Sequence, residues 1–421
     1  MPAETLEDAY NALDPRRPIT PEQVDRLFVT RPSSPVRKIE AQLELSDSRL
    51  KLLFVGHRGS GKSSEMAYLS TLLEANFLSV PVPLYDIFKS PAVSHTEVIF
   101  AMTLRLLVLA TGEAVVARGV LNNVWEHFLE ESYITLKRLI FGDAHIEADR
   151  QQTMTLKLNV LAAELETKIG TESFTRSQVK EKFEGRVVDL LEQIDRVTHL
   201  LEEKIGRNLI LIVEDLDKFD PADTRRLFLD HARTLTAPHP SIIYSFPVAM
   251  RYDNDFKEIE QGFDDVHMLP NVALKHRDGL PDDTGWETMV RICQRRVAPG
   301  LFAEGVTDRA IALSGGHVKS FIQLMQQAVL NAVVDEAEIV QLSNLKEAQR
   351  AMRDDYIVLL RREQIRLLRL LRDDPDKDLV DITPEKQALL SNGSLLEYAD
   401  ERGPWADVNP VVLELLDRDW A

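Results

Sequence analysis

GHRGSGKS, at residues 56–63, matches the pattern G-x-x-x-x-G-K-[ST] in full, between the apolar run 52–55 and a helical pattern of apolar residues that begins at Met66. A strand before the motif and a helix after it are the context that a phosphate-binding loop requires. Its glycines let backbone N–H groups turn inward around phosphate oxygens, and the helix adds its positive N-terminal end. Lys62 is expected to reach the β- and γ-phosphates, and the hydroxyl of Ser63 to bind Mg²⁺. The predicted cofactor-binding residues are Gly56, His57, Arg58, Gly59, Ser60, Gly61, Lys62, Ser63 and Ser64.

Acids after a second buried strand supply the other half of such a site. Five apolar residues, 209–213, end in Glu214 and Asp215. Because ligands bind at the carboxyl ends of the strands in an open α/β sheet, these carboxylates are expected beside the phosphates. One would hold Mg²⁺ together with Ser63, and the other would orient the attacking water. By position Glu214 takes the metal and Asp215 acts as the base, but the division of roles stays open, and Asp217 could serve as well.

The rest of the pattern alternates strands with helices. Further strands are expected at 78–84, 242–246 and 266–269, and Pro81 and Pro83 indicate an edge position or an irregular strand for the first of them. Helices are expected over 95–140 and 176–204, and an exposed hairpin at the start of 153–170. This alternation predicts an α/β fold with a parallel sheet covered on both faces. Residues 284–337 have a helical pattern throughout, and the tail ends in two short strands, at 394–398 and 405–408.

Two weaker signals complete the predicted catalytic set of Lys62, Glu214, Asp215, Ser245 and Lys319. Ser245 lies inside the strand 242–246, where a hydroxyl could sense the γ-phosphate or position water, or could bond to its own backbone. Lys319 lies in the first turn of a helix that follows Gly315 and Gly316. A cation there is unfavourable for the helix dipole, which points to an anionic partner such as phosphate.

GHRGSGKS, IVEDLDK, IIYSFP and SGGHVKSFIQLM, in this order, resemble motifs of the bacterial P-loop ATPases of the AAA and STAND type, including KAP-like and origin-recognition-like ATPases. The resemblance spans about residues 30–340 and implies ATP and Mg²⁺ as cofactors. It implies Walker A, Walker B, sensor-1 and sensor-2 roles, in that order, for Lys62 with Ser63, Glu214 with Asp215, Ser245, and Lys319. Because Lys319 stands where these families usually have arginine, its grip on phosphate would be less directional. The resemblance also makes residues 31–37 a base-binding stretch, and no residue stands out as an arginine finger.

Composition and the resemblance together divide the chain into four parts, and the first is predicted from its richness in proline and charge. A loose N-terminal arm, residues 1–35, precedes a P-loop ATPase core at 36–280. A helical lid follows at 281–345 and a winged-helix-like domain at 346–421. Lys62 and Asp215 are further apart in the sequence than a minimal core needs, so an inserted helical or hairpin segment is expected at about 110–200.

A winged-helix-like domain raises DNA binding as an alternative function. Arginines at 361–372 support it, but residues 361–421 are net acidic and the expected recognition helix, 384–390, offers only Lys386. A protein that reads a DNA groove needs phosphate neutralisation and side chains that reach the bases. We therefore expect a protein-contact or nucleotide-gating role for this domain, with DNA as the disfavoured partner.

The composition limits the remaining choices. A formal net charge of −18 excludes a uniformly basic nucleic-acid coat. The single cysteine, Cys293, can form neither an internal disulfide nor a cysteine-rich metal site, which fits a reducing cytoplasm. No apolar run approaches the length of a membrane span, and the N-terminus lacks an apolar signal core. These features predict a cytoplasmic protein without a membrane partner.

The sequence thus suggests an ATP-binding and ATP-hydrolysing molecular switch with slow or regulated turnover. Such a switch couples nucleotide state to conformational change or self-assembly. The resemblance places such switches in bacterial signalling or antiphage defence and implies a homo-oligomer or a partner protein. Two alternatives stay open: a DNA-linked ATPase of the replication-initiator or transposition-regulator type, and a non-catalytic nucleotide-binding scaffold.

Overall fold

The computed structural model describes residues 2–110, 130–134, 137–138, 157, 160, 181, 184–379 and 382–417. Of the helix expected over 176–204, it describes α11 (Val187–Ile205). The helices expected over 95–140 are represented by α6 (His95–Ala110) and a few residues beyond it. The hairpin expected from residue 153 lies outside the described residues, apart from Lys157 and Val160.

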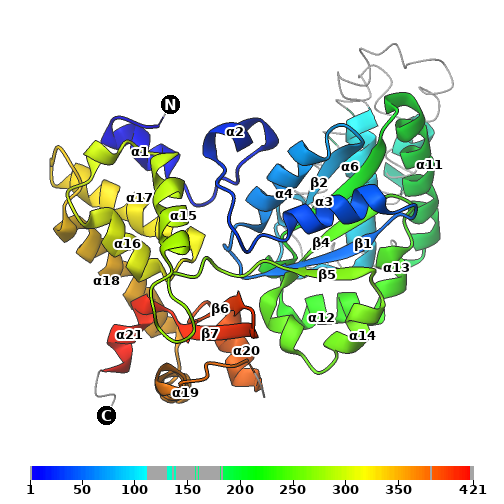
Figure 1. Ribbon diagram of the computed structural model, residues 1–421. Helices are drawn as coiled ribbons and strands as arrows, with labels where there is room; N and C mark the ends of the chain where they lie inside the picture. Colours follow the sequence, from blue (N-terminus) through cyan, green and yellow to red (C-terminus); the bar gives the residue numbers. More distant parts are fainter. Residues whose placement is uncertain are drawn as a thin grey trace.

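Five parallel strands form the central sheet (Figure 1). They are β1 (Lys51–Gly56), β2 (Phe77–Pro83), β3 (Asn208–Glu214), β4 (Ser241–Pro247) and β5 (Asp265–Met268), in the order β2-β3-β4-β1-β5. Each pairing is parallel, which confirms the expected α/β fold. β2, which carries Pro81 and Pro83, lies at an edge of the sheet as expected. Proline has no N–H to donate, and an edge strand needs backbone hydrogen bonds to a neighbouring strand on one side only.

Both faces of the sheet are covered by helices, which explains why its strands read as continuous apolar runs. Alternate residues of a strand point to opposite faces. On one face, Val55 and Val213 pack in a cluster with residues of α6 and α11. On the other, Phe54 and Ile212 pack with α3 (Val36–Leu45) and α4 (Lys62–Leu72). The other core elements are α5 (Leu84–Phe88), η3 (Leu216–Lys218), α12 (Pro221–Asp230), α13 (Ala232–Thr236), η4 (Val248–Tyr252) and α14 (Phe256–Gln261).

A second, helical lobe follows the sheet along the chain. It consists of α15 (Asp283–Gln294), η5 (Pro299–Leu301), α16 (Val306–Ser314), α17 (Val318–Val334) and α18 (Leu342–Leu359), and we call it the lid. The buried residues of the lid belong to an apolar cluster separate from those of the sheet, which Ala9, Leu13 and Val411 join. Its helices agree with the helical pattern expected over 284–337. No helix in the described part of the chain is long and apolar enough to cross a membrane.

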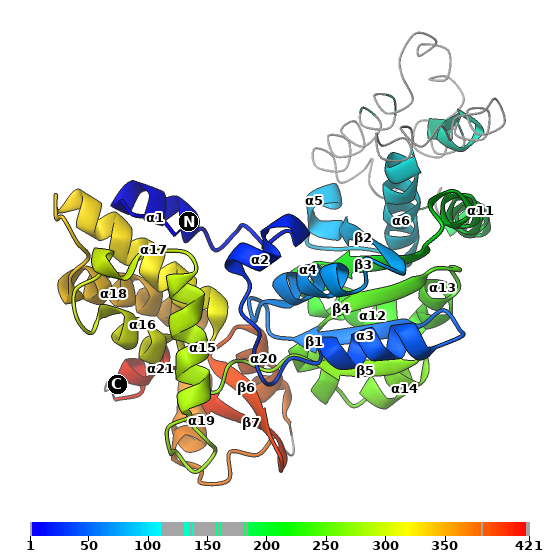
Figure 2. The same cartoon turned by 45° about the horizontal axis from the view of Figure 1, so that its top comes forward.

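The N-terminal segment is ordered and helical, so the expectation of a loose arm over residues 1–35 is wrong. It contains α1 (Leu6–Ala12), η1 (Pro21–Gln23) and α2 (Val24–Leu27). Ala9 and Leu13 are buried in the cluster of the lid, and Gln326 of α17 donates a hydrogen bond to the carbonyl of Tyr10 at 2.9 Å. Figure 2 shows α1 lying along α17, with α2 between the lid and the sheet.

The C-terminal unit packs against the lobe that contains the central sheet. Its elements are α19 (Arg362–Asp373), α20 (Pro384–Ser391), β6 (Leu395–Asp400), β7 (Gly403–Val408) and α21 (Pro410–Leu416). β6 and β7 form an antiparallel hairpin, close to the two strands expected at 394–398 and 405–408. Leu390 and Val408 of this unit belong to the same apolar cluster as Val248 and Met250 of η4. α20, the candidate recognition helix of the disfavoured DNA-binding alternative, is thus packed against η4.

Candidate functional site

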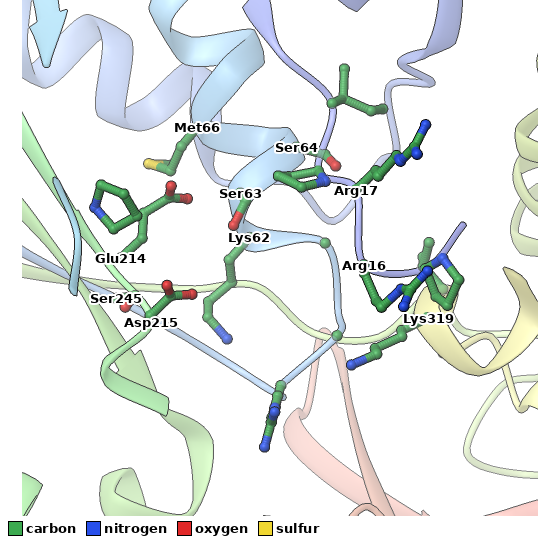
Figure 3. A pocket seen from close by; sticks show the side chains of 18 of the residues that line it. Arg16, Arg17, Lys62, Ser63, Ser64, Met66, Glu214, Asp215, Ser245 and Lys319 are labelled. Atoms are coloured by element: carbon green, nitrogen blue, oxygen red, sulfur yellow. The ribbon is translucent and has the colours of Figure 1, made fainter. Parts of the chain in front are cut away.

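A cavity of about 700 Å³ lies at the carboxyl edge of the sheet, between the N-terminal segment and the start of α17. A cavity of this volume can hold a nucleotide-sized ligand. It is lined by all of the predicted catalytic residues and, from the loop, by Arg58, Gly59, Gly61, Lys62, Ser63 and Ser64. Figure 3 shows Lys62 and Ser63, at the start of α4, facing Glu214 and Asp215 at the end of β3. The structure therefore brings together residues from four distant segments of the chain.

The lid docks directly on the loop 56–63. Gly59 has φ 93° and Gly61 has φ 99°, in the left-handed region that favours glycine. A Cβ atom on Gly59 would lie 2.7 Å from the Cβ of Lys319, so the close approach of the lid also requires glycine there. The Lys319 N–H donates to the carbonyl of Gly59 at 3.1 Å, and His317 Nε2 lies 3.0 Å from the carbonyl oxygen of Arg58.

Lys62 is paired with a carboxylate at the place where it is expected to meet phosphate. Its Nζ donates to the carbonyls of Gly56 and His57 at 2.9 Å each and lies 2.7 Å from Asp217 Oδ2. Burial alone would raise the pKa of Asp217, but Lys62, together with Arg58 and Lys218, holds this pKa below its ordinary value. A bound triphosphate would therefore exchange one anionic partner of Lys62 for another.

Ser63 and Glu214 are the pair that fits a magnesium ion. Burial raises the pKa of Glu214, and a hydrogen bond with Ser63 opposes that rise. Burial also raises the pKa of Asp215, opposed by Lys218, whose Nζ lies 2.6 Å from Asp215 Oδ1. Hydroxyl and carboxylate oxygens are the hard ligands that Mg²⁺ prefers. Asp215 lies beside this pair in Figure 3, so it remains the candidate base.

Ser245 and Lys319 both line the cavity, but their surroundings differ. The Leu216 N–H donates to Ser245 Oγ at 3.2 Å, so this hydroxyl holds the turn after β3 rather than bonding to its own backbone. Burial lowers the pKa of Lys319, and the nearby cations Arg58 and Lys218 lower it further. Lys319 forms no ion pair within the described part of the chain, which leaves a partly desolvated ammonium at the cavity wall.

Residues 31–37 brace the loop from behind instead of lining the cavity. Arg31 Nε donates to Glu65 Oε1 and Arg31 Nη2 to the carbonyl of Ser60, both at 2.8 Å and both buried. Apolar residues from the N-terminal segment and from α17 line the cavity instead: Pro18, Ile19, Leu27, Val318 and Ile322. These residues, rather than 31–37, offer the surface on which a base could rest.

The C-terminal unit reaches the same loop through His57. The Glu397 N–H, on β6, donates to His57 Nε2 at 2.9 Å, and a second hydrogen bond joins this histidine to the backbone of Leu390 on α20. Burial lowers the pKa of His57 well below its ordinary value, helped by the nearby His317 and Lys62. A neutral imidazole accepts one hydrogen bond and donates another, so His57 fits between the two elements.

Glu397 places a buried carboxyl group directly behind this contact. Its Oε1 accepts a hydrogen bond from the hydroxyl of Tyr252 at 2.6 Å, with Arg251 Nη1 4.0 Å away. Its Oε2 has no hydrogen-bond partner among the described residues. Burial raises the pKa of Glu397 to about 7, even though Tyr252 and Arg251 act to lower it. This carboxyl group therefore changes charge close to neutral pH.

Glu397→Gln is expected to flatten the pH dependence of stability. The folded state keeps the Glu397 proton up to about pH 7, whereas the unfolded chain loses it near the ordinary pKa of about 4.3. The stabilisation is therefore complete below that lower value and is lost as the pH rises toward 7, by at most about 1.4 kcal/mol per pH unit. Denaturant midpoints measured between pH 5 and pH 8 test this. Glu401→Gln, at an exposed position in the same hairpin, is the control. Parallel profiles for wild type and Glu397→Gln would contradict the assignment.

Three parts of the site were missed by the sequence interpretation. Residues 11–27 line the cavity although they precede the expected core. His317 had a usable signal, because a residue between Gly-Gly and a helix is a natural N-cap, and its side chain does accept from the Ser320 N–H. Glu397 had no usable signal in the sequence, because its partner His57 lies 340 residues away along the chain.

Comparison with known proteins finds distant structural similarity only. No family model matches the chain, and no curated protein matches it. The chain is similar to the Orc1 protein of Aeropyrum pernix solved in complex with DNA, with a TM-score of 0.42, 10% identity and coverage of 97% of this chain and 96% of that one. It is similar to Cdc6p of Pyrobaculum aerophilum, with a TM-score of 0.39, 11% identity and coverage of 96% and 97%. It is also similar to the RuvB Holliday junction branch migration motor of Thermotoga maritima, with a TM-score of 0.37, 11% identity and coverage of 93% of this chain and 99% of that one. These similarities are too distant to carry a functional conclusion to this chain.

Proposed function

We propose that this chain is an ATP-binding and ATP-hydrolysing switch in which the state of the phosphate-binding loop is passed to the lid and to the hairpin β6–β7. The observation that carries the proposal is that both units hold the same short loop. The loop contacts the hairpin through His57. It contacts the lid through Arg58 and Gly59. A loop that must wrap phosphate oxygens cannot change without affecting contacts made by its own residues.

The side chains of the cavity divide the chemistry between them. Lys62 moves from Asp217 to the β- and γ-phosphates, where its positive charge stabilises the transition state. Ser63 and Glu214 would hold Mg²⁺, which would supply positive charge beside the phosphates. Asp215 orients the attacking water, and its raised pKa suits a group that accepts a proton. Lys319 contributes a cation from the lid, so that lid position and phosphate state depend on each other.

The apolar end of the cavity supports a nucleotide over inorganic polyphosphate. Ile19 and Leu27 come from the N-terminal segment, and Val318 and Ile322 come from the lid. A flat base between these side chains would contact both parts at once, which adds a second link between ligand and lid. ATP is favoured over GTP because the sequence contains no guanine-reading N-K-x-D motif.

Hydrogen exchange at the Glu397 amide tests the coupling. This N–H donates to His57, so its protection reports directly on the contact between the hairpin and the loop. We expect the exchange rate of this amide to change when ATP and Mg²⁺ are added to wild type, and to stay constant in Lys62→Ala. Unchanged exchange in a wild type that demonstrably binds ATP would refute the coupling while leaving the binding site intact.

The alternatives receive less support from the geometry. A non-catalytic scaffold predicts ATP binding without phosphate release by the wild type, which a turnover assay distinguishes. A DNA-linked ATPase would use the C-terminal unit to read a groove, yet Gln387 of α20 donates to the carbonyl of Tyr252 at 2.9 Å and Leu390 is buried. Assembly with a second copy or a partner protein remains part of the proposal, and light scattering after size-exclusion chromatography, with and without ATP and Mg²⁺, tests it.

A further inference from the structure

The lid carries a second concave site, remote in sequence from the phosphate-binding loop. It is a cleft of about 460 Å³ lined by residues of α16, α18 and α21. The residues from α18 recur at intervals of three and four positions, which places them on one face of the helix. They are Leu342, Leu345, Lys346, Gln349, Arg350 and Arg353.

The cleft is strongly basic although the chain as a whole has a net charge of −18. Arg309, Lys346 and Arg350 are exposed, and none of the three forms an ion pair with any residue that the structure describes. The fourth cation, Arg353, pairs with Glu414 at 3.0 Å. That carboxylate, the one acid in the lining, also accepts a hydrogen bond from Gln349 at 2.7 Å. The acid is therefore already satisfied, and the other three cations are available to an anion.

We propose that this cleft binds a phosphorylated small molecule of about nucleotide size, as a site separate from the ATP cavity. Guanidinium groups bind phosphate oxygens through paired hydrogen bonds, and Lys346 adds a third positive charge. Leu342, half exposed at the same face, offers an apolar surface to the remainder of the ligand. The volume lies within the range of small-molecule sites.

A compact anion fits better than a nucleic-acid chain. Acidic residues adjoin the cations, at Glu304 just before α16, at Asp308 in its first turn, and at Glu347 and Asp354 on α18. A polyanion that continued past the cleft would meet these charges, whereas a small ligand would stay among the cations. Proteins that bind a nucleic-acid backbone instead neutralise many phosphates along a track.

Calorimetric titration with inorganic pyrophosphate, on the full chain, tests the proposal. The variant Arg309→Gln/Arg350→Gln removes two cations from the cleft. The control Arg366→Gln/Arg402→Gln removes two exposed arginines from the C-terminal unit. All four positions are exposed, so folding should be preserved, as circular dichroism can verify. We expect the affinity of the cleft for pyrophosphate to fall about tenfold for each cation removed in the cleft variant. The control variant should bind pyrophosphate at the cleft with wild-type affinity. ATP turnover should be unchanged in both variants.

Pyrophosphate that binds at the ATP cavity should do so equally in both variants. A difference in pyrophosphate affinity between the two variants therefore reports on the cleft alone. Identical titrations for the two variants would overturn the proposal. A parallel titration with a single-stranded oligonucleotide separates the rival ligand. If the cleft variant lost affinity for the oligonucleotide and not for pyrophosphate, the cleft would be a nucleic-acid contact and the proposal would be wrong.

Discussion

Lys62→Ala is expected to lower the rate of ATP hydrolysis by about a hundred- to a thousandfold, the usual effect of removing a preorganised group that stabilises developing charge. This ammonium is held by two loop carbonyls and by Asp217, so its own neighbours position it at the start of α4. Its loss removes both the positioning and the charge. Phosphate release, measured with saturating ATP and Mg²⁺, provides the test.

The matched control is Lys38→Ala. Lys38 is an exposed lysine of α3 whose side chain lies 3.5 Å from Asp265 and outside the cavity. Its removal takes the same charge from the same lobe, so turnover should stay at the wild-type rate. Equal turnover in wild type and Lys62→Ala would mean that the loop at 56–63 does not carry the reaction.

Asp217→Asn is expected to destabilise the ligand-free protein by about 3–5 kcal/mol, because it leaves a buried ammonium without its counter-charge. The side chains of Lys62 and Asp217 are only 8% and 10% exposed, so water replaces the missing carboxylate poorly. Phosphate oxygens can replace it. ATP should therefore raise the unfolding temperature of Asp217→Asn by more than it raises that of wild type. Differential scanning calorimetry with and without ATP measures both effects.

Asp223→Asn provides the comparison. Asp223 is an acid of α12 that pairs with Arg226 at the surface, and surface pairs contribute about 0–1 kcal/mol. Its ligand-free stability and its response to ATP should both match those of wild type. If Asp217→Asn were as stable as this control, the pair between Lys62 and Asp217 would not form in solution.

The sheet could be predicted because its signals are local. Each strand is a short apolar run, and the run 209–213 is buried on both faces, so no alternation was needed to recognise it. The loop 56–63 is equally local, since its glycines and Lys62 act within one turn. The meeting of Glu214 with Ser63 followed from a general rule, that carboxyl ends of parallel strands share one edge.

Contacts between units could not be predicted, because an apolar residue shows that it will be buried but not against what. The sequence predicts that Leu390 is buried on one face of a helix, but nothing in it indicates that this face packs against η4. Ala9 and Leu13 are part of a proline- and charge-rich segment, so their burial in the lid was hidden by the composition around them. The bond between His57 and Glu397 depends on both of these long-range placements and on the docking of the lid.

The apolar cluster shared by the C-terminal unit and the core has a practical consequence for work with shortened chains. A chain ended after the lid would leave Val248, Met250 and their neighbours facing water. Each large apolar side chain exposed in this way lowers the free energy of unfolding by about 1.5–3 kcal/mol and enlarges an exposed apolar patch. Such a fragment would be expected to aggregate, and its inactivity would reveal nothing about the need for β6 and β7 in catalysis. Point changes at the interface, in the full-length protein, are the sounder route to that question.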